Sequence, residues 1–400
     1  MAASRTIIVA GAGIGGLTTA LVLARQGFRV VILEKAERLE EAGAGVQLSP
    51  NASRVLVELG LREKLACRAV IPEAISLMSA RRGREIARLP LETAATFHQD
   101  APYWVIHRAD LQAALRDEVG RVADIDLRLG CQFEDLSSHA KGLTVVQRSG
   151  MARREEPAVA LIGADGIWSA VRRRLFPQIQ PHFSGLIAWR GVIEANQLPR
   201  EYTSRRLQLW LGPRAHLVAY PISGGRQINL VAVVKGTWNR PGWSEPGESN
   251  EIRGAFASAG WHAVARMMIG AVDNWRKWAL FTVPEGGEWS DGAVALLGDA
   301  AHAMLPFAAQ GAAMAIEDAA VLAKSLNQIQ KPGGPNIPAA LKHYESLRRP
   351  RVLRVLRTAR QQGRIYHLAN PMAFVRDLVI RTLGPRRMLA RQSWIYDWRA

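Results

Sequence analysis

The stretch Arg5–Glu34, RTIIVAGAGIGGLTTALVLARQGFRVVILE, contains the pattern that decides the fold. Its first six residues form a β-branched apolar run, which is typical of a buried parallel strand. A glycine-rich turn follows, then apolar residues at helical spacing over 17–24, and Gly27 stands where a helix C-cap is expected. A second apolar run, 28–33, ends at an acidic residue. The order strand, glycine turn, helix, strand and acid predicts a dinucleotide-binding βαβ unit.

The glycine turn predicts where the phosphates of a nucleotide would bind. Gly11 allows the tight turn, Gly13 lets a pyrophosphate approach the backbone, and Gly16 lets the helix pack on the sheet. The N–H groups at the helix N-terminus, at Ile14 and Gly15, favour a negatively charged ligand. A merely structural glycine turn is the alternative, but it would not require the acid that ends the second strand.

The acid at the end of the second strand restricts the nucleotide. Glu34 is placed to accept hydrogen bonds from a ribose, and Lys35 is expected beside it at the cofactor. A carboxylate at this position disfavours a 2′-phosphate. The ligand predicted from this unit is therefore FAD or NAD rather than NADP.

The remainder of the chain predicts an α/β domain that is interrupted by a second sheet. Apolar and polar residues alternate over 207–211, 217–220 and 228–234, as in an antiparallel sheet. Other expected elements are helices at 51–59, 108–119 and 310–326, strands at 126–129, 158–162 and 293–297, and a loop at 331–335. We expect a dinucleotide-binding domain over 1–180 and 286–330, a sheet domain over 181–285 to which part of 70–105 contributes, and C-terminal helices over 331–400.

Composition excludes several classes of protein. Hydrophobic residues make up 48% and charged residues 22%, which is ordinary for a globular enzyme. No apolar run reaches the roughly eighteen residues of a membrane span, and the N-terminus does not resemble a signal peptide. The two cysteines, Cys67 and Cys131, predict neither a metal site nor a disulfide framework. We expect a cytoplasmic protein, monomeric or homodimeric, without a metal.

The net charge of +17 raises the possibility of a nucleic-acid partner. Most of the excess lies in residues 341–400, which carry a net charge of +11. There Arg354, Arg357, Arg360 and Arg364 recur at three- and four-residue steps, which predicts a helix with a solvated basic face. No recognised nucleic-acid module accompanies the charge, so we expect a surface that attracts anionic substrates rather than a nucleic-acid interface.

Two later motifs carry a resemblance to a known family. They are Asp165-Gly166-Ile167-Trp168-Ser169-Ala170-Val171-Arg172 and Gly298-Asp299-Ala300-Ala301-His302. With the N-terminal glycine turn, they resemble the single-component flavoprotein aromatic hydroxylases, over about residues 5 to 365. Gly45–Ala52 and Ala188–Gly191 are similar to the branch that includes salicylate, 3-hydroxybenzoate and 6-hydroxynicotinate hydroxylases. The chain departs from the wider pattern at Ala309 and Ala313, where many relatives have glycine and asparagine.

The resemblance implies a fold, a cofactor and a reaction. The fold would be a Rossmann-like FAD-binding domain with an inserted antiparallel substrate-binding sheet and C-terminal helices, as in p-hydroxybenzoate hydroxylase. FAD would be bound tightly, NADH or NADPH would reduce it transiently, and O₂ would add to form a flavin C4a-hydroperoxide that hydroxylates a small phenolic carboxylate. The residues implied to contact FAD, beyond those of the βαβ unit, are Gln47, Arg108, Asp165, Asp299, Pro306, Gly311 and Ala312.

The catalytic base and the substrate contacts are also inferred from the resemblance. A hydroxyl on the ring must be deprotonated to make the ring electron-rich, and histidine suits that task near neutral pH. His216 stands in an H-x-x-x-Y-P setting in which relatives place the base. The substrate contacts expected are Trp189, Trp210, Tyr220, Pro306 and Gln310. Two alternatives stay open: a family relative acting on a larger polyketide- or quinone-like aromatic, and a non-enzymatic basic protein that binds nucleic acid.

Overall fold

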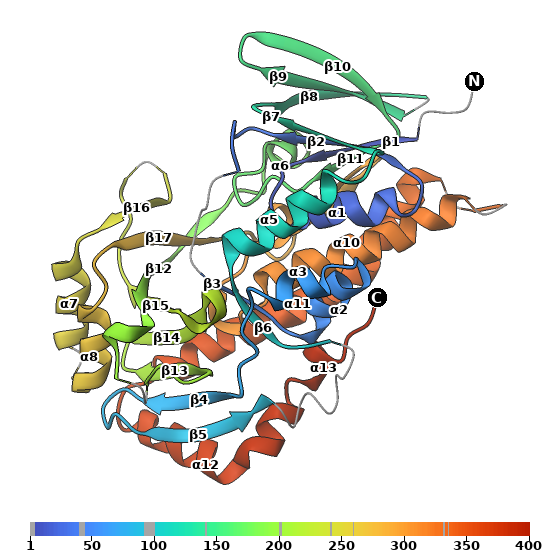
Figure 1. Cartoon of the computed structure of the whole chain (residues 1–400). Helices are drawn as coiled ribbons and strands as arrows, with labels where there is room; N and C mark the ends of the chain where they lie inside the picture. The colour runs from blue at the N-terminus through green and yellow to red at the C-terminus, as the bar shows by residue number, and fades with distance from the viewer. Residues whose placement is uncertain are drawn as a thin grey trace.

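The computed structural model describes residues 5–39, 45–91, 101–140, 142–199, 202–240, 242–258, 260–330, 333–334 and 336–400. Of the expected loop at 331–335, residues 331, 332 and 335 lie outside the described residues, as do residues 92–100 of the segment 70–105. Figure 1 shows one sheet with helices along one face, a second sheet beside it, and the C-terminal helix α12 (Met372–Ala390) beneath strands β4 and β5.

A six-stranded sheet carries the N-terminal unit. Its strand order is β18 (Ser290–Asp291), β19 (Val294–Leu296), β11 (Ala160–Gly163), β1 (Thr6–Ala10), β2 (Arg29–Glu34) and β7 (Ile125–Leu129). All neighbours pair in parallel except β18 and β19. Since parallel strands are buried on both faces, the central strands are rich in apolar side chains, and every residue of β1 is buried. The α/β prediction is confirmed.

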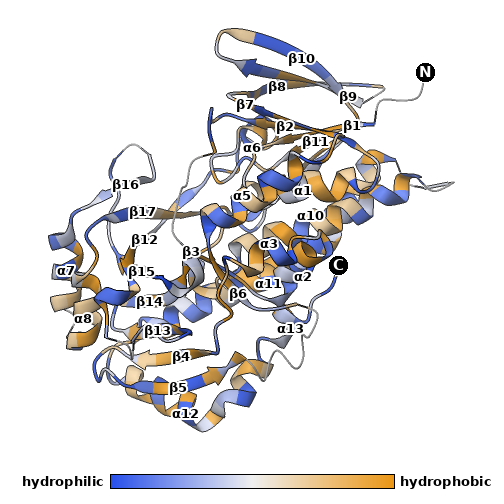
Figure 2. Ribbon diagram, in the orientation of Figure 1, coloured by the Kyte–Doolittle hydropathy of each residue, from blue (hydrophilic) through white to orange (hydrophobic). Residues whose placement is uncertain are grey.

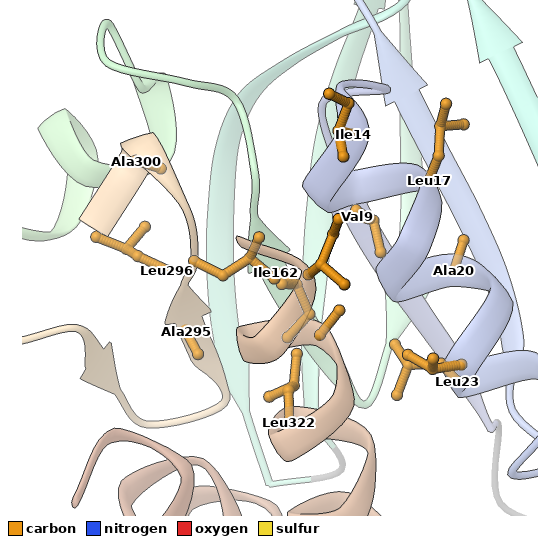
Figure 3. Packing of buried hydrophobic residues seen from close by; sticks show 14 of the residues in the cluster. Val9, Ile14, Leu17, Ala20, Leu23, Ile162, Ala295, Leu296, Ala300 and Leu322 are labelled. Carbon is orange, nitrogen blue, oxygen red and sulfur yellow. The ribbon is translucent and has the colours of Figure 1, made fainter. Parts of the chain in front are cut away.

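Helices cover one face of this sheet. Helix α1 (Ile14–Ala24) lies against α10 (Gly311–Asn327) and α5 (Arg108–Val119). In Figure 3 Val9 and Ile162 of the sheet face Leu17 of α1 and Leu322 of α10, and Figure 2 shows both helices as strongly apolar. Val9, Ile162 and Leu322 are fully buried, and each such side chain stabilises the fold by about 1.5–3 kcal/mol.

The opposite face is covered by a three-stranded antiparallel sheet that the sequence did not predict. It consists of β8 (Gln132–His139), β9 (Gly142–Ser149) and β10 (Ala152–Ala158). Its apolar residues, such as Leu143 and Val145, join the main core, whereas β10 presents four consecutive charged residues over 153–156. That run of charge hides the strand pattern in the sequence.

The second sheet lies at the lower left of Figure 1 and has eight strands. Its order is β16 (Ser244–Gly247), β17 (Trp275–Thr282), β12 (His182–Glu194), β15 (Gln227–Lys235), β14 (Ala215–Ile222), β13 (Arg206–Gly212), β4 (Ala74–Ser79) and β5 (Glu85–Pro90). Every pair is antiparallel except β13 with β4. Strands β4 and β5 come from an earlier part of the chain and extend the inserted sheet.

The two faces of the second sheet have different partners. Two helices that the sequence did not predict, α7 (Ser249–Ser258) and α8 (Ala263–Gly270), pack on one face. Residues Leu217, Ala219, Leu230 and Ala232 point into that core. Because successive strand residues alternate, His216, Val218, Val231 and Val233 point to the other face, toward the nucleotide-binding sheet. The site therefore lies between the two sheets.

Candidate active site

A cleft of about 310 Å³ lies between the two sheets. One side consists of the glycine turn after β1, the loop after β19 and the start of α10. The other side is the face of β12, β14 and β15 that points toward the nucleotide-binding sheet. Its lining includes Gly13, Ile14, Gly15, Gln47, Arg108, His216, Tyr220, Asp299, Pro306, Gly311 and Ala312, all of which the sequence analysis placed at the cofactor or substrate. Residues more than 280 positions apart thus meet in one site.

The glycine turn leaves room for a ligand at one position only. A Cβ atom on Gly11, whose φ is +102°, would lie 2.5 Å from the carbonyl oxygen of Ala164. A Cβ atom on Gly16 would lie 1.9 Å from the carbonyl oxygen of Gly11. Around Gly13, by contrast, nothing described lies within 4 Å of that position. Gly11 and Gly16 are therefore needed for the turn and for helix packing, and the open space beside Gly13 would let a ligand approach the backbone.

Two helix N-termini open into the cleft. Helix α1 begins at Ile14 after Gly13, and α10 begins at Gly311 after Gln310; neither preceding residue caps its helix with a side chain in the described structure. Uncapped N–H groups at the positive ends of two helices favour negative charge. FAD carries a pyrophosphate and a flavin carbonyl that accumulates charge on reduction, so the residues present fit this group. Ile14 and Gly15 would hold the pyrophosphate, and Gly311 and Ala312 the flavin.

The acidic residues predicted at the cofactor have three different environments. The Oε2 atom of Glu34 accepts from the N–H of Ala12 at 2.8 Å, and its Oε1 atom accepts from that of Ala36. This carboxylate is half-buried beside the glycine turn, where a ribose would lie, whereas Lys35 is exposed and does not line the cleft. Asp299 is exposed within the cleft and has no hydrogen bond to another described residue, so its carboxylate is available to a ribityl hydroxyl.

Asp165 does not line the cleft. Its Oδ2 atom accepts from the N–H groups of Ala170 and Val171, which start helix α6 (Ala170–Leu175). Burial raises the pKa of Asp165, despite these hydrogen bonds. The following residue, Gly166, does line the cleft. Asp165 therefore orients this loop, and the loop backbone faces the ligand.

A buried ionic network supports the loop that carries Asp299. Asp318 accepts from the N–H of Gly298 at 3.0 Å and pairs with His302 at 2.6 Å and with Arg348 at 2.7 Å. Arg348 also pairs with Glu317 at 2.6 Å, and Arg351 with Glu317 at 2.7 Å. Burial acts to raise the pKa of Asp318, but the interactions with His302 and Arg348 outweigh it and hold that pKa at about 2.

The loop between β19 and α10 contains a conformationally costly residue. Pro306 starts a 3₁₀ turn that ends at Ala309, which has a φ of +53°. This left-handed conformation is unfavourable for any residue with a Cβ atom. Both residues line the cleft. Ala309 therefore stands, in place of the glycine of many relatives, at a position where glycine would relieve backbone strain.

Trp189, Trp210 and Gln310 do not line the cleft, so these three substrate predictions need correction. Trp189 and Trp210 belong to the core between the second sheet and helices α7 and α8, and they are 1% and 0% exposed. Strand alternation is the reason: in β12 it directs Arg190, not Trp189, to the cleft. Gln310 is buried beside the cleft, where it donates to the Ser49 hydroxyl and accepts from the Asn51 amide.

Arg190 is a cation in the cleft with no carboxylate partner among the described residues. Its guanidinium lies 5.1 Å from the ring centre of Trp278, and its Nε atom is buried without a hydrogen bond. Burial lowers the pKa of Arg190, and the nearby charge of Arg108 adds to this effect. The sequence analysis left open whether Arg190 binds a substrate or a structural carboxylate, and no structural ion pair is found in the described part of the chain.

His216 lines the cleft and has a partner that the sequence did not predict. Its Nδ1 atom lies 2.8 Å from the Nε2 atom of His367, the C-cap residue of α11 (Ile337–Tyr366). Burial lowers the pKa of His216 well below its usual value, as does the nearby His367. Because the two histidines are 151 residues apart, no local pattern could have paired them. Val218 could have been predicted from alternation with His216 on β14, whereas Val231 and Val233 reach the same face through the pairing of β14 with β15.

Comparison with known proteins agrees with this geometry over the whole chain. A family model described as an FAD binding domain matches residues 4–359. The chain is 35% identical over 399 residues to the 3-hydroxybenzoate 6-hydroxylase of Klebsiella oxytoca, covering 100% of this chain and 98% of that protein. It is 32% identical over 414 residues to the salicylate hydroxylase of Pseudomonas putida, covering 97% and 91%. A solved salicylate hydroxylase substrate complex superposes with a TM-score of 0.82 at 26% identity, covering 98% and 95%.

These findings decide between the main alternatives. No described helix is both long and apolar enough to cross a membrane. The non-enzymatic alternative is wrong, because the family model describes an FAD binding domain and the full-length relatives are hydroxylases. The two-sheet architecture with C-terminal helices, expected from the resemblance, is confirmed. The chain therefore belongs to the FAD-binding family of flavin-dependent aromatic monooxygenases.

Proposed function

We propose that this monooxygenase hydroxylates a phenolic carboxylate, with the substrate carboxylate at Arg190 and its hydroxyl at His216. The observation that carries the proposal is an arginine without a carboxylate partner among the described residues and a histidine, which lie on the same face of one sheet in the cleft that fits FAD. When bound, FAD supplies the activation of O₂, with electrons from NADH or NADPH. The relatives named 3-hydroxybenzoate 6-hydroxylase and salicylate hydroxylase support a substrate of this class.

The sheet register sets the distance between the two groups. Arg190 pairs with Val231, and Val231 pairs with Val218, which is two residues from His216 on β14. With about 4.8 Å between strands and about 3.4 Å per residue, the Cα atoms of Arg190 and His216 lie roughly 12 Å apart. Both side chains rise from the same face. A single ring with a carboxylate and a hydroxyl, hydrogen-bonded at each end, spans such a gap.

His216 would accept the proton of the substrate hydroxyl. Its Nε2 atom has no partner among the described residues, while its Nδ1 atom lies next to His367. If Nδ1–H of His216 donates to Nε2 of His367, then Nε2 of His216 carries a lone pair and can act as the base. The opposite tautomer would place a proton there and would remove the base. His367 is thus a positioning residue that selects the useful tautomer.

Tyr220 would complete the polar contacts of the substrate. It lies on the same face as His216, four residues along β14, and it packs against the backbone of Gly45. Burial raises the pKa of Tyr220, so its hydroxyl stays protonated and can donate a hydrogen bond. Arg190 and Tyr220 bind and orient the ring, His216 removes the proton, and the sheet excludes water from the reacting atoms.

The experiment is a screen of hydroxybenzoates and hydroxypyridine carboxylates for oxygen-dependent NADH and NADPH oxidation, with product analysis. In His216→Ala we expect FAD binding to persist and hydroxylation to fall by about 10²–10⁴-fold. In Arg190→Met we expect KM for the carboxylate to rise about 10- to 100-fold, since a charged hydrogen bond contributes about 1.5–3 kcal/mol. His343→Ala, an exposed histidine on α11, is the control. Near wild-type hydroxylation by His216→Ala across pH would refute the role of the base.

A second candidate, a larger aromatic substrate, is favoured by one specific observation. A cavity of about 630 Å³ adjoins the cleft. The space behind Trp210 is filled by α7 and α8, so it offers no room for a larger substrate. The extra volume lies instead on the cleft side of the sheet, beneath α12.

A further inference from the structure

The cavity beneath α12, which lies between that helix and strands β4 and β13, is continuous with the cleft. The two spaces share the lining residues Gln47, His216, Val218, Pro306 and Ala309. The proposed base therefore stands at the junction of a cleft of about 310 Å³ and a cavity of about 630 Å³. A substituent on a ring held at His216 can enter the cavity without leaving the reaction site.

The floor of the cavity is an apolar sheet surface. Alternate residues of β13, namely Leu207, Leu209 and Leu211, line it, together with Ile75 and Leu77 of β4. The parallel register places Ile75 beside Leu207 and Leu77 beside Leu209, so these leucines and isoleucine form two adjacent rows. The opposite wall is α12, which contributes Met372, Val375, Val379, Ile380 and Leu383.

The charged residues of the cavity are already engaged or lie near its opening. Arg376 pairs with Asp377 at 2.8 Å and donates to the carbonyl oxygen of Tyr366. The guanidinium of Arg354 stacks 3.8 Å above the ring centre of Trp394, and Arg391 is exposed. Near the junction, the Gln47 side chain accepts from the hydroxyl of Tyr103 at 2.8 Å. The sheet wall therefore complements an apolar group and not a second charged one.

We propose, on the basis of the function above, that the natural substrate carries an apolar substituent, alkyl or aryl, which occupies the cavity beneath α12. The cavity by itself is of the size that binds drug-like ligands, about 300–1,000 Å³. Each methylene group transferred from water to such walls strengthens binding about fourfold, so a butyl group contributes roughly 100-fold to kcat/KM.

The first experiment compares phenolic acids that differ only in an alkyl chain, from none to hexyl, at each free ring position. With the FAD-loaded enzyme we expect kcat/KM for hydroxylation to rise severalfold per methylene for one position. Equal or falling kcat/KM with chain length at every position would overturn the inference. If no phenolic acid of any length is hydroxylated, the proposed function fails instead, and the two failures are thereby distinguished.

Two neighbouring substitutions on α12 test the place of binding. Val379 lines the cavity and is 47% exposed, whereas Leu378 is 52% exposed and does not line it. We expect Val379→Trp to raise KM for the hexyl acid about tenfold or more and to leave the single-ring acid unchanged. Leu378→Trp should change neither. Equal effects of the two variants, or no effect of Val379→Trp, would contradict the assignment.

A deeper substitution and a competitor complete the test. Leu209→Trp fills the cavity from the sheet side, and retained FAD absorbance and an unchanged melting temperature show that the variant is folded. Leu209→Trp should abolish the increase in kcat/KM that a longer alkyl chain gives in the wild type. Dodecanoate, which lacks the ring, should compete only weakly with the hexyl-substituted phenolic acid for binding to the enzyme. If dodecanoate binds tightly and loses affinity in Val379→Trp while alkyl phenols show no advantage, the cavity binds a fatty acid and the inference is wrong.

Discussion

Replacing Arg348 by methionine tests whether the buried ionic network supports the cofactor loop. The Arg348 side chain is 1% exposed, and its partners Glu317 and Asp318 are 0% exposed. Removing one partner of a buried ion pair costs about 3–5 kcal/mol, because the remaining charge stays buried. In the variant Glu317 still pairs with Arg351 and Asp318 still pairs with His302. We therefore expect a destabilisation at the lower end of this range, about 3 kcal/mol. For 400 residues, an unfolding entropy of about 2 cal/mol/K per residue converts this to a decrease of about 4 °C in Tm.

The assay combines thermal unfolding with titration of the apoprotein with FAD. Because Asp318 also accepts from the N–H of Gly298, next to Asp299, the same variant should raise the Kd for FAD. Arg349→Met is the matched control: that side chain is 32% exposed and lies 3.6 Å from Glu345, and such pairs contribute about 1 kcal/mol or less. If Arg348→Met is within 1 kcal/mol of the wild type and binds FAD normally, the reasoning is refuted.

Two further predictions concern the turn and the histidine pair. Gly16→Ala should lose FAD binding, since its Cβ atom would lie 1.9 Å from the Gly11 carbonyl oxygen; a normal flavin spectrum in this variant would contradict that reason. Burial lowers the pKa of His367 to about 4, and Lys235 adds to this effect. Below about pH 6.5 the histidine of the unfolded chain therefore binds a proton that the folded chain does not bind. The free energy of unfolding consequently decreases as the pH is lowered from about 6.5 toward 4. Between pH 8 and pH 5 the free energy of unfolding, measured with urea, should decrease less in His367→Asn than in the wild type, by about 1–2 kcal/mol. Equal decreases in the two proteins would exclude His367 as the cause.

The sequence by itself determined the nucleotide-binding unit, because that unit is local. Gly16 and Glu34 act on neighbours within the same thirty residues, and their steric and hydrogen-bonding requirements appear directly in the spacing. Gly11 is also required by a distant neighbour, the carbonyl oxygen of Ala164. The strands of the second sheet were also predictable, because alternation of apolar and polar residues reflects the two faces of a sheet. The positions of Asp299 and His216 in the cleft agree with the predictions made from the motifs.

Only the tertiary structure decided which face of the second sheet forms the site. Both faces of β12 and β14 are apolar enough to be buried, so the sequence could not tell that Trp189 packs against α7 and α8 while Arg190 faces the cleft. The partner of His216 and the cavity beneath α12 come from the last forty residues, which pack against strands far earlier in the chain. Long-range packing creates both features, and no local spacing encodes it.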